Sequence, residues 1–471
     1  MGLKALGTAL PPAFKDRMRE QLGDEYGAFI ESYGQSSLRA LRLNPLKMEK
    51  KELIDLFSQN KGLAPFFHLE NIPWEETGFY YGSEDEPGRS PYHDAGVYYI
   101  QEPSAMLPVN LLMSGSSQGE EGLRILDLCA APGGKSTQIA ARMNGKGLLI
   151  CNEVIPARCR ILSENIERMA VRNAIVLNEE PDRLSERFEE YFDRILVDAP
   201  CSGEGMFRKN EAAVSEWSEE IVKLCAERQQ EILKAADRML KYGGTLVYST
   251  CTFSKAENEE TTEIFLKEHP EYRLKEQIRL MPHRIKGEGH FAAKLIKGEG
   301  DPSELSLRGK KGRASLSPED VRDFFQFADE NLVSVEDSVG ITKKDPMGKA
   351  LIRFGDNLYL APGECPELTG LKVLRPGLQL GTSRKGHFIP SHALALSLKP
   401  GDFRRSVMLP VYTEGSGEGD LRIKEYLKGM TFPFEGENGW YLICADGFSA
   451  GFGKLSGNVM KNHYPKGLRR Q

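Results

Sequence analysis

Between residues 123 and 270, short apolar runs alternate with longer segments in which apolar residues recur every three to four positions. The short runs predict buried strands, and the longer segments predict amphipathic helices. Strands are expected at 123–129, 147–154, 173–179, 192–200 and 244–251, and helices from the glycine turn to 143, over 156–170 and over 218–240. The Tyr-Gly-Gly at 242–244 is expected to stop the last helix. Because strands this apolar are buried on both faces, we expect a largely parallel, doubly wound α/β sheet with helices on both sides.

The pattern differs on either side of this region. Before it, Phe14, Met18, Leu22, Tyr26 and Phe29 follow helical spacing and 38–45 resembles a strand, which predicts a small α+β segment. After it, 297–317 is polar and rich in Gly and Ser, as is typical of a linker. The alternation over 438–455 suggests a small β-barrel near the C-terminus. The expected boundaries are 1–95, a catalytic domain at 96–297, a linker at 298–317, and C-terminal domains at 318–385 and 386–471.

Composition narrows the class of protein. A chain of 471 residues exceeds one ordinary core, so about two to four domains are expected. No apolar run approaches the ~18 residues of a membrane span, so no membrane partner is expected. The eight cysteines include no C-x-x-C pair and the eight histidines no H-E-x-x-H cluster. We therefore expect no disulfide framework, no metal site and a reducing cytoplasm. The protein is also expected to be a monomer.

The charge distribution hints at a polyanionic partner. The net charge is −6, but residues 351–471 carry 16 lysines and arginines against 11 acidic residues. Basic residues cluster with His, Phe and Tyr at 383–388, 402–406 and 461–470. Such clusters are often merely solvated, and contact with RNA is the alternative.

The turn "AAPGGKS" follows the first strand of the predicted sheet, where α/β proteins bind their ligands. A phosphate-binding P-loop needs a glycine where Cys129 stands, and the dinucleotide fingerprint lacks its third glycine. S-adenosylmethionine is the remaining common occupant. Glu153, which closes the second strand, supports an adenosine ligand because an acid at that spacing accepts hydrogen bonds from ribose hydroxyls. A tight turn without a ligand is the alternative.

Two cysteines lie just beyond predicted strands, Cys201 after the fourth and Cys251 after the fifth. Cys129, Cys151, Cys159 and Cys225 lie in apolar contexts and are interpreted as core residues. A thiol beside a methyl donor suits methylation of carbon 5 of a pyrimidine, because addition to carbon 6 makes carbon 5 nucleophilic. Asp198 is a candidate acid near ring nitrogen 3, and the second cysteine a candidate for aiding release. The residues alone do not decide which cysteine attacks.

The phrases "DLCAAPGGKSTQIA", "NEV", "LVDAPCSGEGMFRK" and "YSTCTFSKAENEE" resemble those of the Nop/Sun (Fmu) family of RNA (cytosine-5)-methyltransferases. "YYIQEPSAMLP", "MPHRIKGEGHFAAKL" and "KNHYPKGLR" are similar to its bacterial RsmF-type branch, which acts on 16S rRNA. The resemblance implies a Rossmann-like S-adenosylmethionine-dependent core, an RNA-binding N-terminal segment and a C-terminal PUA-like RNA-binding domain. It also implies 16S rRNA or the small ribosomal subunit as partner.

The resemblance also assigns roles to residues. It implies that Cys251 is the nucleophile, that Cys201 assists product release, that Asp198 contacts the cytosine near the cofactor, and that Lys135 orients both. The residues expected to hold S-adenosylmethionine are Ala130, Ala131, Pro132, Gly133, Gly134, Lys135, Ser136, Glu153, Glu180 and Asp198. The sequence departs from the family after the third strand, where an Asp usually contacts adenine. Asn178, Glu179 and Glu180 are the candidates there.

Four further residues have open interpretations. His290 and Phe291 lie near the target base or are purely structural, and Arg208 and Lys209 resemble phosphate contacts. A non-catalytic RNA-binding factor for ribosome assembly is the alternative function on the same fold. Methyl transfer to a protein or small molecule is a third, which leaves the basic C-terminal region unexplained.

Overall fold

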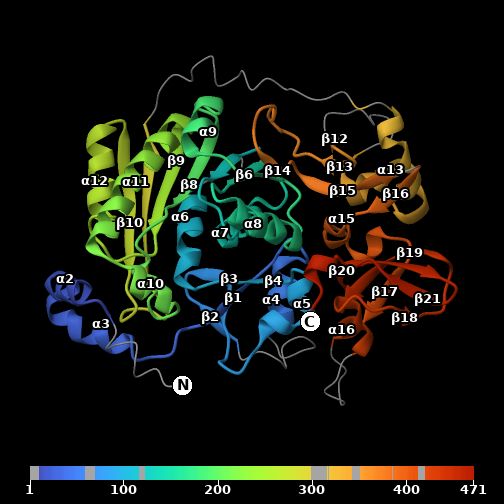
Figure 1. Ribbon diagram of the computed structural model, residues 1–471, viewed down its shortest axis with the longest axis horizontal. Coiled ribbons are helices and arrows are strands. Elements are labelled where there is room, and N and C mark those ends of the chain that lie inside the picture. The colour runs from blue at the N-terminus through green and yellow to red at the C-terminus, as the bar shows by residue number, and fades with distance from the viewer. Residues whose placement is uncertain are drawn as a thin grey trace.

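The computed structural model describes residues 10–58, 69–115, 122–298, 316, 318–341, 351–384, 386–411 and 420–470. Most of the expected linker at 298–317 lies outside these residues. Figure 1 shows a central sheet flanked by helices, an N-terminal unit below it, and the two C-terminal units one above the other at the right. Among the described residues, no helix is both long and apolar enough to cross a membrane.

The central sheet has eight strands in the order β10-β11-β9-β8-β5-β6-β7-β14. Its five middle strands are parallel, because each apolar strand is followed by a helix that returns the chain to the same edge. This confirms the predicted Rossmann-like α/β core. The strands are β5 (Arg124–Asp127), β6 (Leu148–Asn152), β7 (Ala174–Leu177), β8 (Phe192–Asp198), β9 (Leu240–Thr250), β10 (Tyr272–Leu280), β11 (His290–Lys297) and β14 (Val373–Arg375).

Helices cover both faces of this sheet and bury a separate apolar cluster on each. One cluster joins the sheet to α9, α11 and α12, and the other joins it to α6, α7 and α8. These helices are α6 (Leu107–Met113), α7 (Gly134–Met143), α8 (Pro156–Arg168), α9 (Pro181–Arg187), α11 (Glu219–Met239) and α12 (Glu259–Glu268), with the short α10 (Glu211–Glu216) before α11. Two-sided burial explains why the strands are apolar throughout and why the pattern predicted them well.

The prediction for Tyr242–Gly244 was wrong in detail. Helix α11 ends at Met239, and β9 begins at the next residue and runs through both glycines. Gly243 has φ of +75°, and the register between β8 and β9 shifts in this region. The glycines therefore serve an irregularity within the strand, where backbone with positive φ is needed, and not the end of a helix.

The N-terminal unit consists of helices and a sheet in the order β2-β3-β1-β4. The expected continuous helix is broken at Gly23, whose φ is +54°, and its two halves pack on the catalytic domain through contacts such as Phe14–Phe207 and Phe29–Phe253. Strand β4, which follows the expected boundary at 95, pairs antiparallel with β1 of this sheet. Its elements are α2 (Pro12–Leu22), α3 (Tyr26–Ser32), β1 (Ala40–Leu43), α4 (Lys50–Ser58), β2 (Glu70–Ile72), β3 (Glu75–Tyr80), α5 (Pro91–Asp94) and β4 (Tyr98–Ile100).

The first C-terminal unit is built on an antiparallel sheet in the order β12-β13-β15-β16. Strand β16 follows the expected boundary at 386 but belongs to this sheet. The segment between β13 and β15 leaves the unit and adds β14 to the catalytic sheet. The elements are α13 (Pro318–Asn331), α14 (Val335–Val339), β12 (Leu351–Phe354), β13 (Asn357–Leu360), β15 (Leu378–Arg384), β16 (His387–Pro390) and α15 (His392–Ser397).

The last unit is a five-stranded sheet in the order β17-β19-β20-β21-β18. It contains the residues 438–455, whose alternation suggested a small β-barrel, and lies where the family resemblance implied a PUA-like domain. One hydrophobic cluster joins this sheet to the N-terminal sheet through residues such as Tyr98 and Ile443. The two ends of the chain therefore share a core. The elements are β17 (Ser406–Leu409), α16 (Leu421–Leu427), β18 (Phe432–Pro433), β19 (Gly439–Ala445), β20 (Phe448–Ser456) and β21 (Val459–Asn462).

Candidate active site

The two thiols singled out in the sequence lie together. β8 and β9 are parallel neighbours with Asp198 opposite Ser249, and Cys201 and Cys251 follow their carboxyl ends. The two Sγ atoms are 3.4 Å apart, and both side chains are half-buried. Gly205 permits this approach, because its N–H donates to the Cys251 carbonyl at 2.7 Å and a Cβ atom there would lie 2.7 Å from the same oxygen. A paired-thiol site therefore exists at this edge of the sheet.

A buried carboxylate fixes the loop that carries Cys201. Glu257 accepts hydrogen bonds from the Ser202 main-chain N–H at 2.9 Å, from the Ser202 hydroxyl, and from the Gln229 amide at 3.1 Å. The Ser202 hydroxyl also lies 2.8 Å from that of Thr252, which follows Cys251. The network therefore joins the two cysteine loops. No role was predicted for Glu257 from the sequence. The only signal was the unusually polar segment "SKAENEE" at the start of α12.

Asp198 is surrounded by donors and positive charge. The Lys135 ammonium donates to Oδ2 at 2.8 Å, the Ser249 hydroxyl donates to Oδ1 at 2.8 Å, and His290 Nε2 lies 3.5 Å from Oδ1. Burial raises the pKa of Asp198, but Lys135 and His290 outweigh burial and hold that pKa well below its usual value. The side chain is therefore a carboxylate at neutral pH. This is contrary to the expectation that Asp198 acts as an acid, since an ionised group has no proton to give.

The pKa values of Lys135 and His290, which both lie beside Asp198, shift in opposite directions. Burial lowers the pKa of Lys135, yet the charge of Asp198 outweighs it and leaves that pKa above its usual value. Burial and the Lys135 charge lower the pKa of His290, which is 3% exposed, so its imidazole is neutral at pH 7. Phe291 pairs with Thr250 across β11 and β9, which places His290 beside Cys251. Phe291 itself is fully buried in the core.

The thiols also differ from one another. The hydrogen bond with Cys251, followed by burial, holds the pKa of Cys201 well above its usual value, so Cys201 keeps its proton. Of the four cysteines expected in the core, Cys151 and Cys159 are fully buried, whereas Cys129 and Cys225 are only half-buried. Burial raises the pKa of Cys225 to about 11.

The glycine turn begins α7 beside this site. Gly133 has φ of +113°, and a Cβ atom there would lie 3.2 Å from Leu162, so the backbone requires glycine. Ser136 is fully buried and its hydroxyl donates to Asp127 at 2.6 Å, so this side chain ties the turn to the end of β5. The buried Arg42 of β1 donates to the Gly134 carbonyl at 3.1 Å, a contact that the sequence did not suggest.

Buried amides join the strand ends that carry the predicted adenosine contacts. The Asn152 amide donates to the carbonyls of Leu128 and Glu179, and its oxygen accepts from the Glu179 N–H at 3.0 Å. The Asn178 amide donates to the carbonyls of Glu153 at 2.6 Å and Val154 at 2.9 Å. The carboxyl ends of β5, β6 and β7 are therefore fixed relative to one another.

The candidate acids differ in what they contact. Glu153 is 3% exposed and accepts from the Ile155 N–H at 2.9 Å. Asn178 and Glu179 are buried and bonded within the protein, whereas Glu180 is exposed at the start of α9. Next to Glu153, Val154 and Ile155 are 40% and 46% exposed, which provides apolar surface for a flat ring. A buried acid, an exposed acid, apolar surface and a glycine turn together suit an adenosine-bearing cofactor.

Arg208 was wrongly interpreted as a phosphate contact. It is buried, and its guanidinium donates to Glu288 at 2.5 Å and to the carbonyls of Ser32 and Gly287 at 2.8 and 2.9 Å. It therefore joins the loop after Cys201 to the N-terminal unit. Lys209 lies 3.8 Å from Glu288 and is partly exposed.

The basic clusters are only partly exposed to solvent. Arg470 forms an ion pair with Asp94 and docks the C-terminus on the N-terminal unit. Lys385 lies outside the described residues. The exposed members of the clusters include Arg384, His387, Arg404, Lys461 and Lys466.

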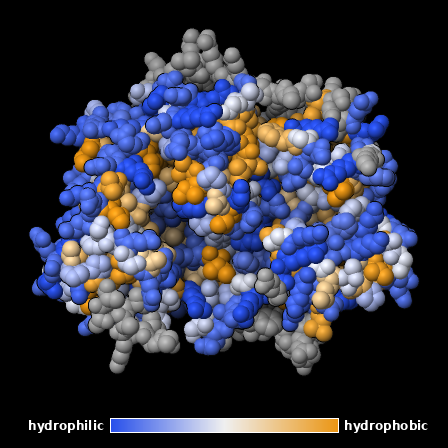
Figure 2. Space-filling model, viewed as in Figure 1, coloured by the Kyte–Doolittle hydropathy of each residue, from blue (hydrophilic) through white to orange (hydrophobic). Residues whose placement is uncertain are grey.

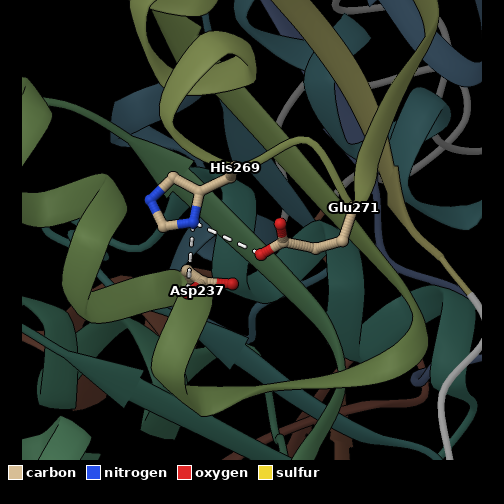
Figure 3. A group of neighbouring side chains, drawn as sticks. All are labelled: Asp237, His269 and Glu271. Atoms are coloured by element: carbon tan, nitrogen blue, oxygen red, sulfur yellow. Dashed lines mark hydrogen bonds and ion pairs between the residues drawn. The ribbon is translucent and has the colours of Figure 1, made fainter.

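Figure 3 shows Asp237, His269 and Glu271, a group whose ligand-type atoms lie within 4.8 Å of one another. The Lys297 ammonium lies 2.8 Å from Asp237 Oδ1, and the Tyr272 hydroxyl donates to the same atom at 2.9 Å. His269 stacks on Phe265 with 4.5 Å between ring centroids. Lys297 and Tyr272 therefore share Asp237 Oδ1, while His269 Nδ1 lies 3.5 Å from Oδ2. The group joins α11, β11 and the turn between α12 and β10.

Four family models match successive parts of the chain. Residues 10–103 match the N-terminal domain of 16S rRNA methyltransferase RsmF, and residues 116–296 match 16S rRNA methyltransferase RsmB/F. Residues 327–398 match the RsmF rRNA methyltransferase first C-terminal domain, and residues 419–470 match the methyltransferase RsmF PUA domain.

Similar proteins span the full length. Ribosomal RNA small subunit methyltransferase F of Aeromonas salmonicida is 33% identical over 466 residues, which cover 94% of this chain and 93% of that protein. The protein of the same name from Erwinia tasmaniensis is 30% identical over 485 residues, covering 98% and 97%. Among solved structures, a methyltransferase homolog protein from Pyrococcus horikoshii is 26% identical with a TM-score of 0.54, covering 62% of this chain and 99% of its own.

Proposed function

Because this chain belongs to the RsmB/F family of S-adenosylmethionine-dependent 16S rRNA methyltransferases, we propose that it methylates carbon 5 of a cytosine in 16S rRNA through a covalent cysteine adduct. Family membership decides against the non-catalytic assembly factor. The observation that carries the proposal is the pair of sulfur atoms 3.4 Å apart beside Asp198 and Lys135. Carbon 5 of cytosine is a weak nucleophile, and a thiol is the group that activates it by addition to carbon 6.

Cys251 is the nucleophile in this proposal, as the family motif implies. The Cys201 sulfur lies 3.4 Å from the Cys251 sulfur, which is close enough for Cys201 to assist its release. Attack by the Cys251 thiolate forms the bond from sulfur to carbon 6 and moves the electron pair of the carbon 5–carbon 6 double bond into the ring. Carbon 5 then takes the methyl group, whose bond to the sulfonium sulfur breaks and leaves S-adenosylhomocysteine. A base removes the carbon 5 proton, the ring double bond re-forms, and Cys251 leaves as thiolate. Cys201 assists this last step.

The Asp198–Lys135 pair binds and polarises the cytosine. As a carboxylate, Asp198 accepts a hydrogen bond from the exocyclic amino group of the base, which selects cytosine over uracil. The Lys135 ammonium supplies the positive charge that stabilises electron density arriving in the ring. His290, neutral and 3.5 Å from Asp198 Oδ1, lies beside the position proposed for the base.

S-adenosylmethionine supplies the electrophilic methyl group when bound. The residues that fit it are the turn from Ala130 to Ser136 with Gly133 at its tightest point, Glu153 for the ribose, Glu180 for the adenine, and Asp198 at the methyl end. Val154 and Ile155 provide apolar cover for the adenine ring. RNA contacts fall to the exposed basic residues of the C-terminal units.

Methyl transfer to 16S rRNA by single-cysteine variants, followed by mass analysis of the nucleosides, tests the proposal. Cys251→Ala is expected to lose transfer entirely while it still binds S-adenosylmethionine. Cys225→Ala is the matched control, because Cys225 is a half-buried thiol on α11. A methylated nucleoside other than 5-methylcytidine, or full activity in Cys251→Ala, contradicts the proposal.

A further inference from the structure

A segment of the first C-terminal unit, residues 364–375, lies along the edge of the catalytic sheet. It ends in β14, which pairs antiparallel with β7 through Val373↔Leu177 and Arg375↔Val176. The catalytic sheet therefore receives its last strand from a unit about two hundred residues further along the chain. We call residues 364–375 the edge segment.

Side chains of the catalytic domain hold the edge segment along its length. Arg124 pairs with Glu364 at 3.4 Å, Arg187 pairs with Glu367 at 3.3 Å, and Arg183 donates to the Gly370 carbonyl. At the far end the buried Arg375 forms an ion pair with Glu167 of α8 and donates to Ser163 at 3.2 Å. Contacts at both ends and in the middle define its position relative to β7.

The main chain of Lys372 connects the edge segment to the loop after β7. Its N–H donates to the Glu179 carboxylate at 2.7 Å, and its carbonyl accepts from the Asn178 N–H at 2.9 Å. Glu179 is 2% exposed, and the guanidinium of Arg183 is 3.6 Å from its carboxylate. The Lys372 N–H is thus the close donor that compensates a buried carboxylate.

The residues held in this way flank the predicted adenosine contacts. Glu179 directly precedes Glu180, and the Asn178 side chain donates to the carbonyls of Glu153 and Val154. Figure 2 shows hydrophobic side chains near the centre of the viewed face, over β6 and β14 in Figure 1. The exposed apolar residues include Val154 and Ile155 after β6 and Leu374 of β14. The edge segment and the adenosine end of the site therefore adjoin one another.

We propose that the first C-terminal unit is part of the cofactor-binding apparatus, with Lys372 as a positioning residue whose main chain holds Glu179 and thereby sets Glu180 and Glu153 for adenosine. The inference rests on the proposed cofactor site but not on the cysteine chemistry. The hydrogen bond from Lys372 to a charged group is of the stronger kind, and loss of its donor loosens the loop that carries Glu180. Loss of the Lys372 N–H should therefore weaken S-adenosylmethionine binding about tenfold, or about 1.4 kcal/mol.

Calorimetric titration of S-adenosylmethionine into full-length Lys372→Pro and Lys372→Ala tests this proposal. Proline removes the N–H, whereas alanine removes only the side chain, so only Lys372→Pro is expected to bind about tenfold more weakly. In methyl transfer the KM for S-adenosylmethionine should rise in Lys372→Pro, while kcat at saturating cofactor and the KM for RNA stay the same. A merely structural role moves these three parameters together.

Glu179→Ala and Glu179→Gln provide a second pair in case Lys372→Pro does not fold. Glutamine keeps an oxygen that accepts from Lys372, so Glu179→Ala should bind the cofactor more weakly than Glu179→Gln does. Wild-type affinity in folded Lys372→Pro, or equal affinities in the two Glu179 variants, overturns the inference and leaves the proposed function intact. If the wild-type protein itself does not bind S-adenosylmethionine, the proposed function fails instead.

Discussion

Replacement of Lys135 by methionine removes the positive charge from Asp198 while it keeps a side chain of similar length. In the wild type, Lys135 and His290 hold the pKa of Asp198 well below its usual value of 3.8. Without the ammonium, the His290 contact alone opposes burial, so the pKa of Asp198 rises. The carboxylate that is proposed to accept the cytosine amino group would then become protonated at a higher pH than in the wild type.

The size of the change follows from the geometry. An aspartate beside one cation has its pKa lowered by about 1–3 units, which corresponds to about 1.4–4 kcal/mol. The Lys135 side chain is 10% exposed and that of Asp198 is 30% exposed, so partial access of water reduces the effect. We therefore expect the pKa of Asp198 to rise by about 1–2 units in Lys135→Met.

The pH dependence of kcat/KM measures this change. Lys135→Met should lose activity at neutral pH, and its acid limb should lie at higher pH than that of Lys135→Arg, which keeps the charge. An acid limb at the same pH in both variants refutes the electrostatic reasoning, because it shows that Asp198 does not depend on the ammonium.

Stability provides an independent check with a defined sign. In the wild type the folded pKa of Asp198 lies below the unfolded value, so its contribution to stability is present above about pH 4 and is lost as the pH falls. In Lys135→Met a rise of about 1–2 units brings the folded pKa of Asp198 closer to the unfolded value, so ionised Asp198 contributes less to stability. Because Asp198 is ionised at both pH values, the deficit relative to wild type in urea unfolding should be similar at pH 7 and pH 5 and should shrink below about pH 4.

Three other changes have defined outcomes. Gly205→Ala should lower the rate about a hundredfold, since a Cβ atom 2.7 Å from the Cys251 carbonyl must displace that loop; a wild-type single-turnover rate would contradict this. Arg208→Ala should lower the free energy of unfolding by about 3 kcal/mol, because buried Glu288 loses its close partner and keeps only Lys209 at 3.8 Å. In Arg208→Ala the salt dependence of RNA affinity should match that of the wild type. A weaker salt dependence would show that Arg208 contacts a phosphate after all. Asn152→Ala should lower the free energy of unfolding by about 1–3 kcal/mol and weaken S-adenosylmethionine binding, because the Glu179 main chain loses its hydrogen bonds to Asn152. Unchanged cofactor affinity would show that the link between the ends of β6 and β7 does not support the cofactor site.

The sequence predicted the catalytic sheet well because its strands are buried on both faces and leave uniformly apolar runs. It also predicted that Asp198, Cys201 and Cys251 meet, since parallel strands bring their carboxyl ends to one edge. The Tyr-Gly-Gly at 242–244 was misjudged because glycine serves an irregular strand as readily as a helix end. Local pattern does not distinguish the two.

Contacts between segments far apart in the chain could not be predicted from the sequence pattern. Nothing near Arg208 indicates that Glu288 faces it, so a buried ion pair looked like an exposed basic residue. Likewise the main chain of Lys372 carries no signal of its partner Glu179, nearly two hundred residues earlier. Such contacts depend on how the units pack, and periodicity within one element does not encode that packing.

The covalent bond between Cys251 and the cytosine is tested most directly with Cys201→Ala protein and 16S rRNA in the presence of S-adenosylmethionine. Because Cys201 is proposed to assist release, this variant should accumulate a protein–RNA adduct that survives denaturing electrophoresis. Peptide mass analysis should find the modified nucleotide on Cys251, and no adduct should form when Cys251 is also replaced by alanine. An adduct on another residue, or no adduct from protein that still methylates the RNA, contradicts the account.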